Sequence, residues 1–238
     1  MMVTLPGFAD AVARTHALPQ LGVGLHFDLT TGAPVSPPGA VPSLVDRRSG
    51  AFVSLPRLAL RALTGRLRAE EVATECAAQL GRLRAAGVSV THLDSHRHVH
   101  ALPGVWAPVV ATARDAGVRI VRVPVEPPPF APAGLRLAVL GISWRVAARA
   151  DRPADAVRVR ALALRGGERF GPRLLRLLDH LPAGTTELVV HPGYADADLA
   201  RWDPYIAGRE RELAALLSLA VRERLRRGDF VLRHFGQL

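Results

Sequence analysis

The chain has 238 residues, a hydrophobic fraction of 49% and a formal net charge of +10. This length fits one large domain with a sizeable core, and we expect residues 1–238 to form a single domain. No stretch is long and apolar enough to span a bilayer, and residues 1–19 lack the basic region and apolar block of a secretory signal. A single cysteine excludes an internal disulfide framework. We therefore expect a cytoplasmic protein without a membrane span.

The positive charge comes from arginine alone, because the sequence contains no lysine. A strongly basic chain is a candidate for nucleic-acid binding. The arginines are scattered, however, and their densest group lies on one predicted helix that also carries Glu223: Arg222, Arg224, Arg226 and Arg227. No aromatic residues alternate with the basic ones, as a base-stacking surface requires. We therefore expect no nucleic-acid partner and ascribe the arginine content to compositional bias.

The apolar pattern predicts strands and helices that alternate along the chain. Helices are expected at 6–17, 58–67, 69–86, 105–116, 135–148, 156–164, 172–181 and 209–227. Strands are expected at 21–29, 88–93, 118–123, 187–190 and 230–235. Such an alternation is typical of an α/β fold with a parallel sheet or barrel, in which functional groups lie on the loops after the strands.

The segment 69–86 has the clearest helical pattern, with an apolar stripe at Val72, Cys76, Leu80 and Leu83. Four polar residues are expected to point away from that stripe: Glu71, Glu75, Gln79 and Arg82. Cys76 is interpreted as a small core residue. The preceding stretch, 31–56, is rich in proline, glycine and serine. Because a loop this long is usually functional or disordered, we expect it to cover a substrate.

Four of the nine histidines fall within residues 91–100, THLDSHRHVH, at the predicted end of a strand. Alternate side chains of an extended chain share one face. One face would therefore carry, for as long as the extension lasts, His92, Asp94, His96, His98 and His100. Pro103 and Gly104 predict the turn into the next helix. The alternative interpretation of this cluster is a solvated, histidine-rich turn.

Two further strand ends carry histidine. His26 and Asp28 share one face of the 21–29 strand, in which Gly22 and Gly24 leave room for a close approach to the backbone. His191 directly follows the 187–190 strand. Two neutral imidazoles and one carboxylate are a common ligand set for a catalytic divalent metal that keeps a position open for water. With a further histidine to protonate a leaving group, the pattern predicts metal-assisted hydrolysis of an amide or ester.

Three segments also resemble signatures of one family: GVGLHFDLT at 22–30, THLDSHRHVH at 91–100 and ELVVHPGY at 187–194. They are similar to the YdjC-like carbohydrate deacetylases, which include chitooligosaccharide deacetylases and deacetylases associated with hopanoid biosynthesis. Tyr205, Arg209 and Glu212 resemble a later run of the same family. The resemblance implies a distorted (β/α) TIM-like barrel that removes N-acetyl groups from amino sugars or oligosaccharides with one divalent metal ion, magnesium or zinc.

The resemblance also implies roles for individual residues. It makes His26 and His96 metal ligands and His191 an acid or transition-state stabiliser. The residues expected to orient these groups or to line the sugar cleft are Asp94, His98, His100, Asp28 and Tyr194. A hydrogen-bonded structural histidine is the alternative at each position, and it is favoured more at His92 and His98. The implied partner is an N-acetylated sugar, and a homodimer is left open.

The chain departs from the family at its start. The family's first strand ends in an Asn-Ala-Asp-Asp-Phe-Gly-like segment, in which one aspartate completes the metal site and the other serves as general base. This chain begins Met1-Met2-Val3 and has no such segment, so the expected barrel lacks its first strand. A start placed too far downstream is the simpler account, and loss of the strand is the other. A barrel without that strand has two unpaired edges.

The departure leaves alternatives open. Without the two aspartates the chain as given would lose most of its catalysis, although Asp28 could in principle replace a ligand. One alternative is a catalytically degenerate relative that binds sugar or metal. The other is an amidohydrolase-type metal hydrolase, which would need further ligand histidines on later strands and a late aspartate.

Overall fold

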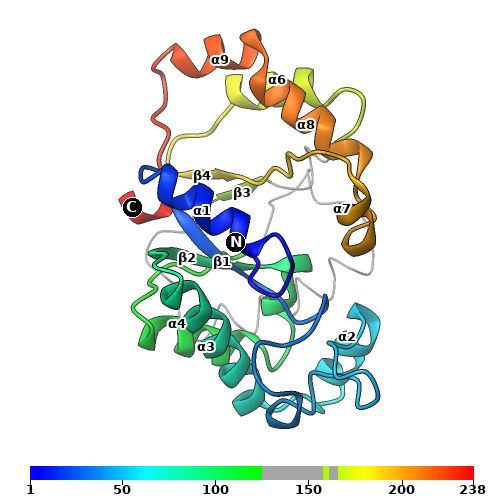
Figure 1. Cartoon of the computed structure of the whole chain (residues 1–238). Coiled ribbons are helices and arrows are strands. Elements are labelled where there is room, and N and C mark those ends of the chain that lie inside the picture. Colours follow the sequence, from blue (N-terminus) through cyan, green and yellow to red (C-terminus); the bar gives the residue numbers. More distant parts are fainter. Residues whose placement is uncertain (125–157, 161–165) are drawn as a thin grey trace. The chain divides into compact units, whose positions relative to one another are not determined.

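A computed structural model describes residues 1–124, 158–160 and 166–238 (Figure 1). These residues fall into two units: residues 1–124 with 233–238, and residues 158–160 with 166–232. Each unit contains helices and one pair of parallel strands. The chain is thus a mixed α/β protein, as predicted. Within its described part, the two sheets have two strands each and neither is closed, so the TIM-like barrel is not confirmed. The single domain over 1–238 stays a prediction.

The sheet of the first unit pairs β1, Val23–Phe27, with β2, Val90–Ser95, in parallel. The strands are held by side chains that are completely buried, among them Leu25, Phe27 and Leu93. The register places His26 opposite Asp94. The predicted strand at 118–123 is reduced to a single parallel bridge between Val121 and Leu93. That bridge nevertheless brings the residue after it, Arg122, to the carboxyl end of β2, where the backbone N–H of Arg122 donates to the Leu93 carbonyl.

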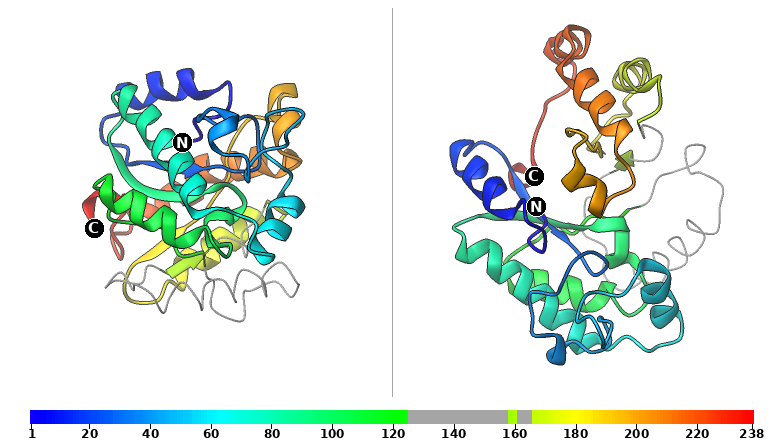
Figure 2. Two further views of the ribbon diagram at one scale, coloured as in Figure 1. Left: turned by 90° about the horizontal axis from the view of Figure 1, so that it is seen from below. Right: turned by 45° about the vertical axis from the view of Figure 1, so that its right-hand side comes forward.

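The first unit has four helices among its described residues: α1 Phe8–Ala17, α2 Leu55–Leu63, α3 Ala69–Ala85 and α4 Trp106–Asp115. Three short 3-10 helices accompany them: η1 Pro38–Ala40, η2 His96–Ala101 and η4 Phe235–Gln237. The helices α3 and α4 lie side by side (Figure 2), and α3 contacts both strands. Cys76 on α3 is completely buried, and burial raises the pKa of its thiol to about 12. The prediction that it is a core residue is confirmed.

The prediction that the polar residues of α3 point away from the core is wrong for three of them. Glu71, Glu75 and Gln79 are buried. The Glu75 carboxylate accepts hydrogen bonds from the backbone N–H groups of Val35 and Ser36, at 2.9 and 3.0 Å. Glu71 accepts one from the N–H of Ser43. Buried backbone donors need partners, and these carboxylates supply them, so the long loop after β1 is anchored to α3.

The second unit pairs β3, Arg158–Arg160, with β4, Thr186–Leu188. Its described helices are α6 Phe170–Asp179, α7 Ala197–Trp202, α8 Ala207–Leu217 and α9 Leu219–Arg226. Phe170, Leu174 and Leu178 repeat every four residues on α6 and form a small core with Val221 of α9. Ser218 separates α8 from α9 and caps α9, because its hydroxyl accepts from the N–H of Val221.

Several predicted elements in the second half of the chain differ from those observed. The helix expected at 156–164 is wrong at 158–160, which form β3. The strand expected at 230–235 is also wrong, since the structure has η4 from Phe235 and no strand at 230–234. The helix at 209–227 is confirmed with a break, and the helix expected at 135–148 lies outside the described residues. No helix in the described part of the chain has the length and apolar character needed to cross a membrane.

Candidate active site

His26 and Asp94 form the centre of the first histidine group. They are opposite each other on β1 and β2, and His26 Nδ1 lies 2.9 Å from Asp94 Oδ1. The other carboxylate oxygen, Oδ2, accepts from Arg122 Nη1. Burial alone would raise the pKa of Asp94, but His26 and Arg122 outweigh it and hold that pKa below its usual range. The ionised carboxylate accepts a hydrogen bond from His26 Nδ1–H, so in the neutral imidazole the lone pair lies on Nε2.

His96 comes directly after β2, and its ring lies beside that of His26. The two ring centroids are 5.7 Å apart with their planes at 71°. The strand ends at Ser95, and the chain turns at once into η2. The extended face therefore ends at Ser95, whereas the turn into the next helix lies at Pro103 and Gly104, just before α4, as predicted. His98 and His100 consequently leave the strand face that would have carried them.

The backbone is strained immediately after His96. Arg97 and His98 have φ values of 54° and 56°, in the left-handed region that residues other than glycine rarely adopt. His98 Nδ1 is buried and has no hydrogen-bond partner among the described residues. Burial, with the neighbouring His100, lowers the pKa of His98 to about 3. Strained backbone and unsatisfied buried polar atoms concentrate at functional sites, so this turn supports a site here.

His100 is a supporting residue by its contacts. It is completely buried, its Nε2–H donates to the Arg122 carbonyl at 2.8 Å, and its Nδ1 pairs with the Ser95 hydroxyl. Burial lowers its pKa to about 4, so the ring is neutral at pH 7. His100 thus fixes the backbone of the arginine that holds Asp94. The sequence reasoning missed Arg122, although a charged residue at the end of the 118–123 strand was a usable signal.

Gly24 of β1 and Gly22, just before β1, accommodate histidines of the protein itself. A Cβ at Gly24 would lie 2.4 Å from the ring of His92, and one at Gly22 would lie 2.5 Å from the ring of His234. The ring of His92 also packs on Phe235, with centroids 4.4 Å apart. The close approach predicted at these glycines is therefore present, and the structural interpretation of His92 agrees with its contacts.

Asp28 organises the turn after β1. Its side chain is completely buried, and its carboxylate accepts from the backbone N–H groups of Thr30 and Thr31, at 2.9 and 3.1 Å. Burial raises the pKa of Asp28, while the Thr30 contacts oppose that rise. This hydrogen bonding is typical of an aspartate that closes a turn.

The second unit carries His191 just after β4. Glu212 of α8 is buried, and its carboxylate accepts from the backbone N–H groups of His191 and Gly166 and from the Tyr205 hydroxyl. The Tyr205 ring lies edge-on to the His191 ring, with centroids 5.9 Å apart. Tyr194, which the resemblance assigned to the site, is 77% exposed. Whether His191 joins His26 and His96 stays a prediction.

Comparison with known proteins identifies the family of the chain. A family model described as YdjC-like protein matches residues 1–227. The chain belongs to the YdjC-like family. Its relatives include a carbohydrate deacetylase of Geobacillus stearothermophilus, 33% identical over 91% of this chain and 76% of the relative. A chitooligosaccharide deacetylase of Yersinia pestis is 32% identical over 91% of this chain and 78% of the relative.

Two further comparisons concern a relative that matches only part of this YdjC-like chain and a solved structure that matches nearly all of it. A carbohydrate deacetylase of Brevibacillus brevis is 42% identical, but the match spans only 54% of this chain and 46% of that relative. A crystal structure from Enterococcus faecalis, described as a cellobiose-phosphate cleavage protein, has a TM-score of 0.74 at 24% identity. It covers 98% of this chain and 84% of the other. At that identity, the likeness concerns the fold alone.

The divalent metal implied by the YdjC-like resemblance can be tested against the residues present. His26 and His96 supply two neighbouring imidazoles, and Asp94 fixes one of them through Nδ1, as carboxylates do for metal-binding histidines. In residues 1–124, 158–160 and 166–238, however, no group of three or more His, Cys, Asp or Glu side chains is arranged to hold a metal. The described residues therefore offer two candidate ligands for a metal ion, the imidazoles of His26 and His96.

Proposed function

We propose that this YdjC-like protein is a metal-dependent carbohydrate deacetylase that hydrolyses the N-acetyl amide of amino sugars or oligosaccharides. The observation that carries the proposal is the pair of adjacent rings, His26 and His96, with Asp94 ionised behind His26. The relatives named carbohydrate and chitooligosaccharide deacetylases support the substrate class. A (β/α) barrel and a cytoplasmic location remain predictions that fit this function.

His26 and His96 would hold one divalent ion, magnesium or zinc, through ring nitrogens. A bound ion would supply polarisation of the acetyl carbonyl and a water of lowered pKa. The residues around the pair prepare it for that role. Arg122 keeps Asp94 ionised, and Asp94 in turn keeps the proton of His26 on Nδ1. The left-handed residues Arg97 and His98 fix the turn on which the backbone of His96 lies.

His191 would act on the leaving group. Cleavage of an amide releases an amine, which is a poor leaving group unless it is protonated as the C–N bond breaks. An imidazole titrates near neutral pH and can donate that proton. Glu212 holds the backbone of His191, and Tyr205 packs against its ring, so the imidazole has a defined position in its unit. This assignment requires His191 to approach the metal-binding pair.

The test is acetate release from N-acetylated chitooligosaccharides by the purified chain, with and without a chelator. We expect release that stops with chelator and returns when magnesium or zinc is added back. Release that is insensitive to chelator would contradict metal dependence. The absence of any release under all metal conditions would contradict the deacetylase assignment for this chain.

A second candidate function is a non-catalytic relative that binds sugar or metal. It is favoured by the observation that the described residues supply no third ligand beside the two imidazoles. Calorimetric titration with N-acetylated chitooligosaccharides distinguishes the two candidates. Binding without acetate release would support the non-catalytic relative, and turnover would exclude it.

A further inference from the structure

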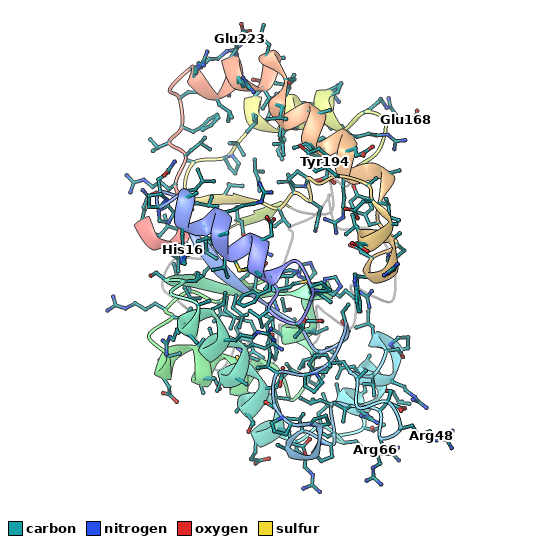
Figure 3. All side chains as sticks on the ribbon, in the orientation of Figure 1. His16, Arg48, Arg66, Glu168, Tyr194 and Glu223 are labelled. Carbon is teal, nitrogen blue, oxygen red and sulfur yellow. The ribbon has the colours of Figure 1, made fainter. Side chains whose placement is uncertain are left out.

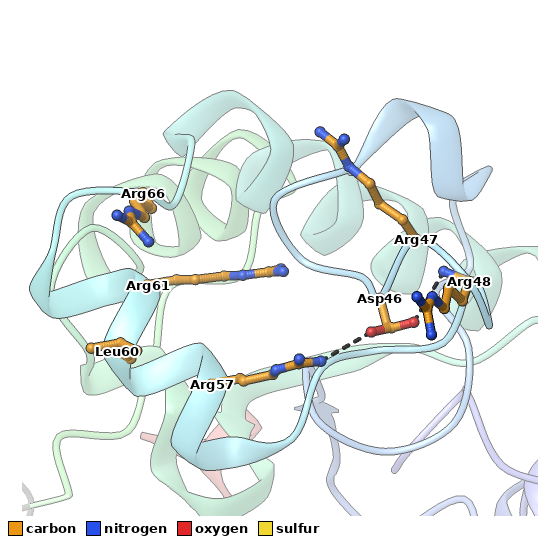
Figure 4. Close-up of a pocket in the computed structure, with 7 residues that line it drawn as sticks. All are labelled: Asp46, Arg47, Arg48, Arg57, Leu60, Arg61 and Arg66. Carbon is orange, nitrogen blue, oxygen red and sulfur yellow. Dashed lines mark hydrogen bonds and ion pairs between the residues drawn. The ribbon is translucent and has the colours of Figure 1, made fainter.

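A basic hollow lies between the loop at residues 46–48 and helix α2, in the first unit (Figure 4). It has a volume of about 410 Å³, and its lining consists of Asp46, Arg47, Arg48, Arg57, Leu60, Arg61 and Arg66. Figure 4 shows Arg57 and Arg61 extending from α2 toward the loop that carries Asp46. Five of the seven lining residues are arginines and one is acidic, so a strong positive charge is concentrated here.

The structure neutralises little of that charge. Arg57 pairs with Asp46 at 3.0 Å, and Arg61 donates to the carbonyl groups of Ser43 and Val45. Arg61 is thereby fixed in direction and keeps its full charge. The other three guanidinium groups, of Arg47, Arg48 and Arg66, make no ion pair or hydrogen bond with any described residue.

The arginine-rich run in the second unit behaves differently. Arg224, at its centre, is buried and pairs with Asp179 and Asp229. Part of the densest arginine run of the sequence is therefore a structural crosslink. The hollow, by contrast, collects five arginines from positions spread over residues 47–66. Figure 3 shows Arg48 and Arg66 projecting from the same part of the surface.

Exposed leucines lie beside this charge. Leu60 lines the hollow and is 57% exposed, and Leu63, one helical turn further along α2, is 60% exposed. Arginines next to exposed aliphatic side chains on a short helix are typical of a surface that rests on an anionic bilayer. The guanidinium groups bind phosphates, and the aliphatic side chains enter the apolar layer below them.

We propose that this surface, the five arginines with Leu60 and Leu63, docks the protein on a membrane of anionic phospholipids. The five guanidinium groups favour a partner that carries phosphate groups. Nucleic acid is the other phosphate polymer, but base recognition uses aromatic side chains for stacking, and the lining of the hollow contains leucine and no aromatic residue. The leucines therefore favour a lipid surface over a nucleic acid.

The experiment is co-sedimentation of the full chain with vesicles at moderate salt. One set of vesicles contains phosphatidylglycerol and phosphatidylcholine, and the other phosphatidylcholine alone. The charge variant is Arg48→Gln with Arg66→Gln, and its matched control is Arg119→Gln with Arg222→Gln, two exposed arginines elsewhere. The apolar variant is Leu60→Ser with Leu63→Ser. Its control is Leu217→Ser with Leu219→Ser, at leucines that are 55% and 67% exposed.

We expect binding only to the phosphatidylglycerol vesicles. The charge variant should bind about thirtyfold more weakly, and the apolar variant about tenfold more weakly. Both control pairs should stay within about twofold of the parent chain, because net charge and total apolar surface are matched. Thermal unfolding of each variant checks that it is folded, and Arg47→Gln with Arg66→Gln replaces the charge variant if it is not.

Three outcomes would overturn the proposal. Equal weakening by both arginine pairs would show that net charge alone drives binding. Full binding by the apolar variant would show that Leu60 and Leu63 do not insert into the bilayer. The reason for preferring a lipid partner would then be lost. Tight binding of a single-stranded RNA that depends on Arg48 and Arg66, with no effect of the leucine pair, would assign the surface to nucleic acid instead.

Discussion

Each unit of the protein has a histidine just after or within a strand and a buried carboxylate beside it, but the two carboxylates hold different parts of the histidine. Asp94 bonds the ring of His26 through Nδ1, whereas Glu212 bonds the backbone N–H of His191. Asp94 is itself held by the charged Arg122, and Glu212 by the neutral donors of Tyr205 and Gly166.

The difference separates two tasks. A carboxylate that is hydrogen-bonded to Nδ1 of a histidine ring selects the tautomer. Nε2 is then left as an electron-pair donor, which suits a metal ligand. A carboxylate on the backbone fixes the loop and leaves both ring nitrogens to find their own partners, which suits a residue that exchanges a proton. We therefore expect changes at the first carboxylate to alter metal binding and changes at the second to alter stability first.

The largest effect is expected from His26→Ala. Loss of a metal ligand should lower kcat/KM for acetate release roughly a thousandfold, because a bound ion supplies several kcal/mol of transition-state stabilisation. The measurement is acetate release together with metal content of the purified protein. His16→Ala, at an exposed histidine of α1, is the control. If both variants keep their metal and activity, His26 is not a ligand.

Asp94→Asn should have the next largest effect. The amide cannot replace both the charge paired with Arg122 and the acceptor for His26 Nδ1. Metal affinity should fall about 10–100-fold, as for other residues that orient ligand histidines. A competition assay with a metal chelator measures this, with Asp115→Asn at an exposed site as control. An unchanged affinity would mean that the ring needs no fixed tautomer.

Glu212→Gln should chiefly reduce stability. The amide would turn one donor toward another donor, leaving a buried partner such as the His191 N–H unsatisfied, at a cost of about 1–3 kcal/mol. Chemical unfolding measures this cost, and Glu210→Gln on the exposed side of α8 is the control. Metal affinity should not change. A metal loss as large as that of Asp94→Asn would contradict the division between the two carboxylates.

A pH dependence of stability is expected from His100. Its pKa is about 4 in the folded chain and near 6.5 when unfolded, because burial disfavours the charged ring. The unfolded chain therefore binds more protons between these values, and stability is lost as pH falls from 6.5 toward 4, by less than about 1.4 kcal/mol for each pH unit. Unfolding curves of His100→Gln should show a shallower slope in this window. An equal slope would exclude His100 as a source.

Much of the site's local setting could be predicted from the sequence. Alternation placed His26 and Asp94 near the ends of strands, and the helix of Cys76 was recognised from its stripe. The partners of these residues could not be predicted in the same way. Arg122 reaches Asp94 through a single bridge to β2, and Glu75 meets residues 35 and 36 across a long loop. Such contacts depend on how distant segments pack.

The sequence by itself determined which residue types occur and with what period, because burial and the geometry of strands and helices act over a few neighbouring residues. It therefore set the β1 and β2 strands and the helices α1 to α4. Only the tertiary structure decided which buried donor each carboxylate satisfies and where the arginines remain unneutralised. A hydrogen bond forms with whatever group the fold brings within about 3 Å, and the local sequence pattern does not predict which distant groups come that close.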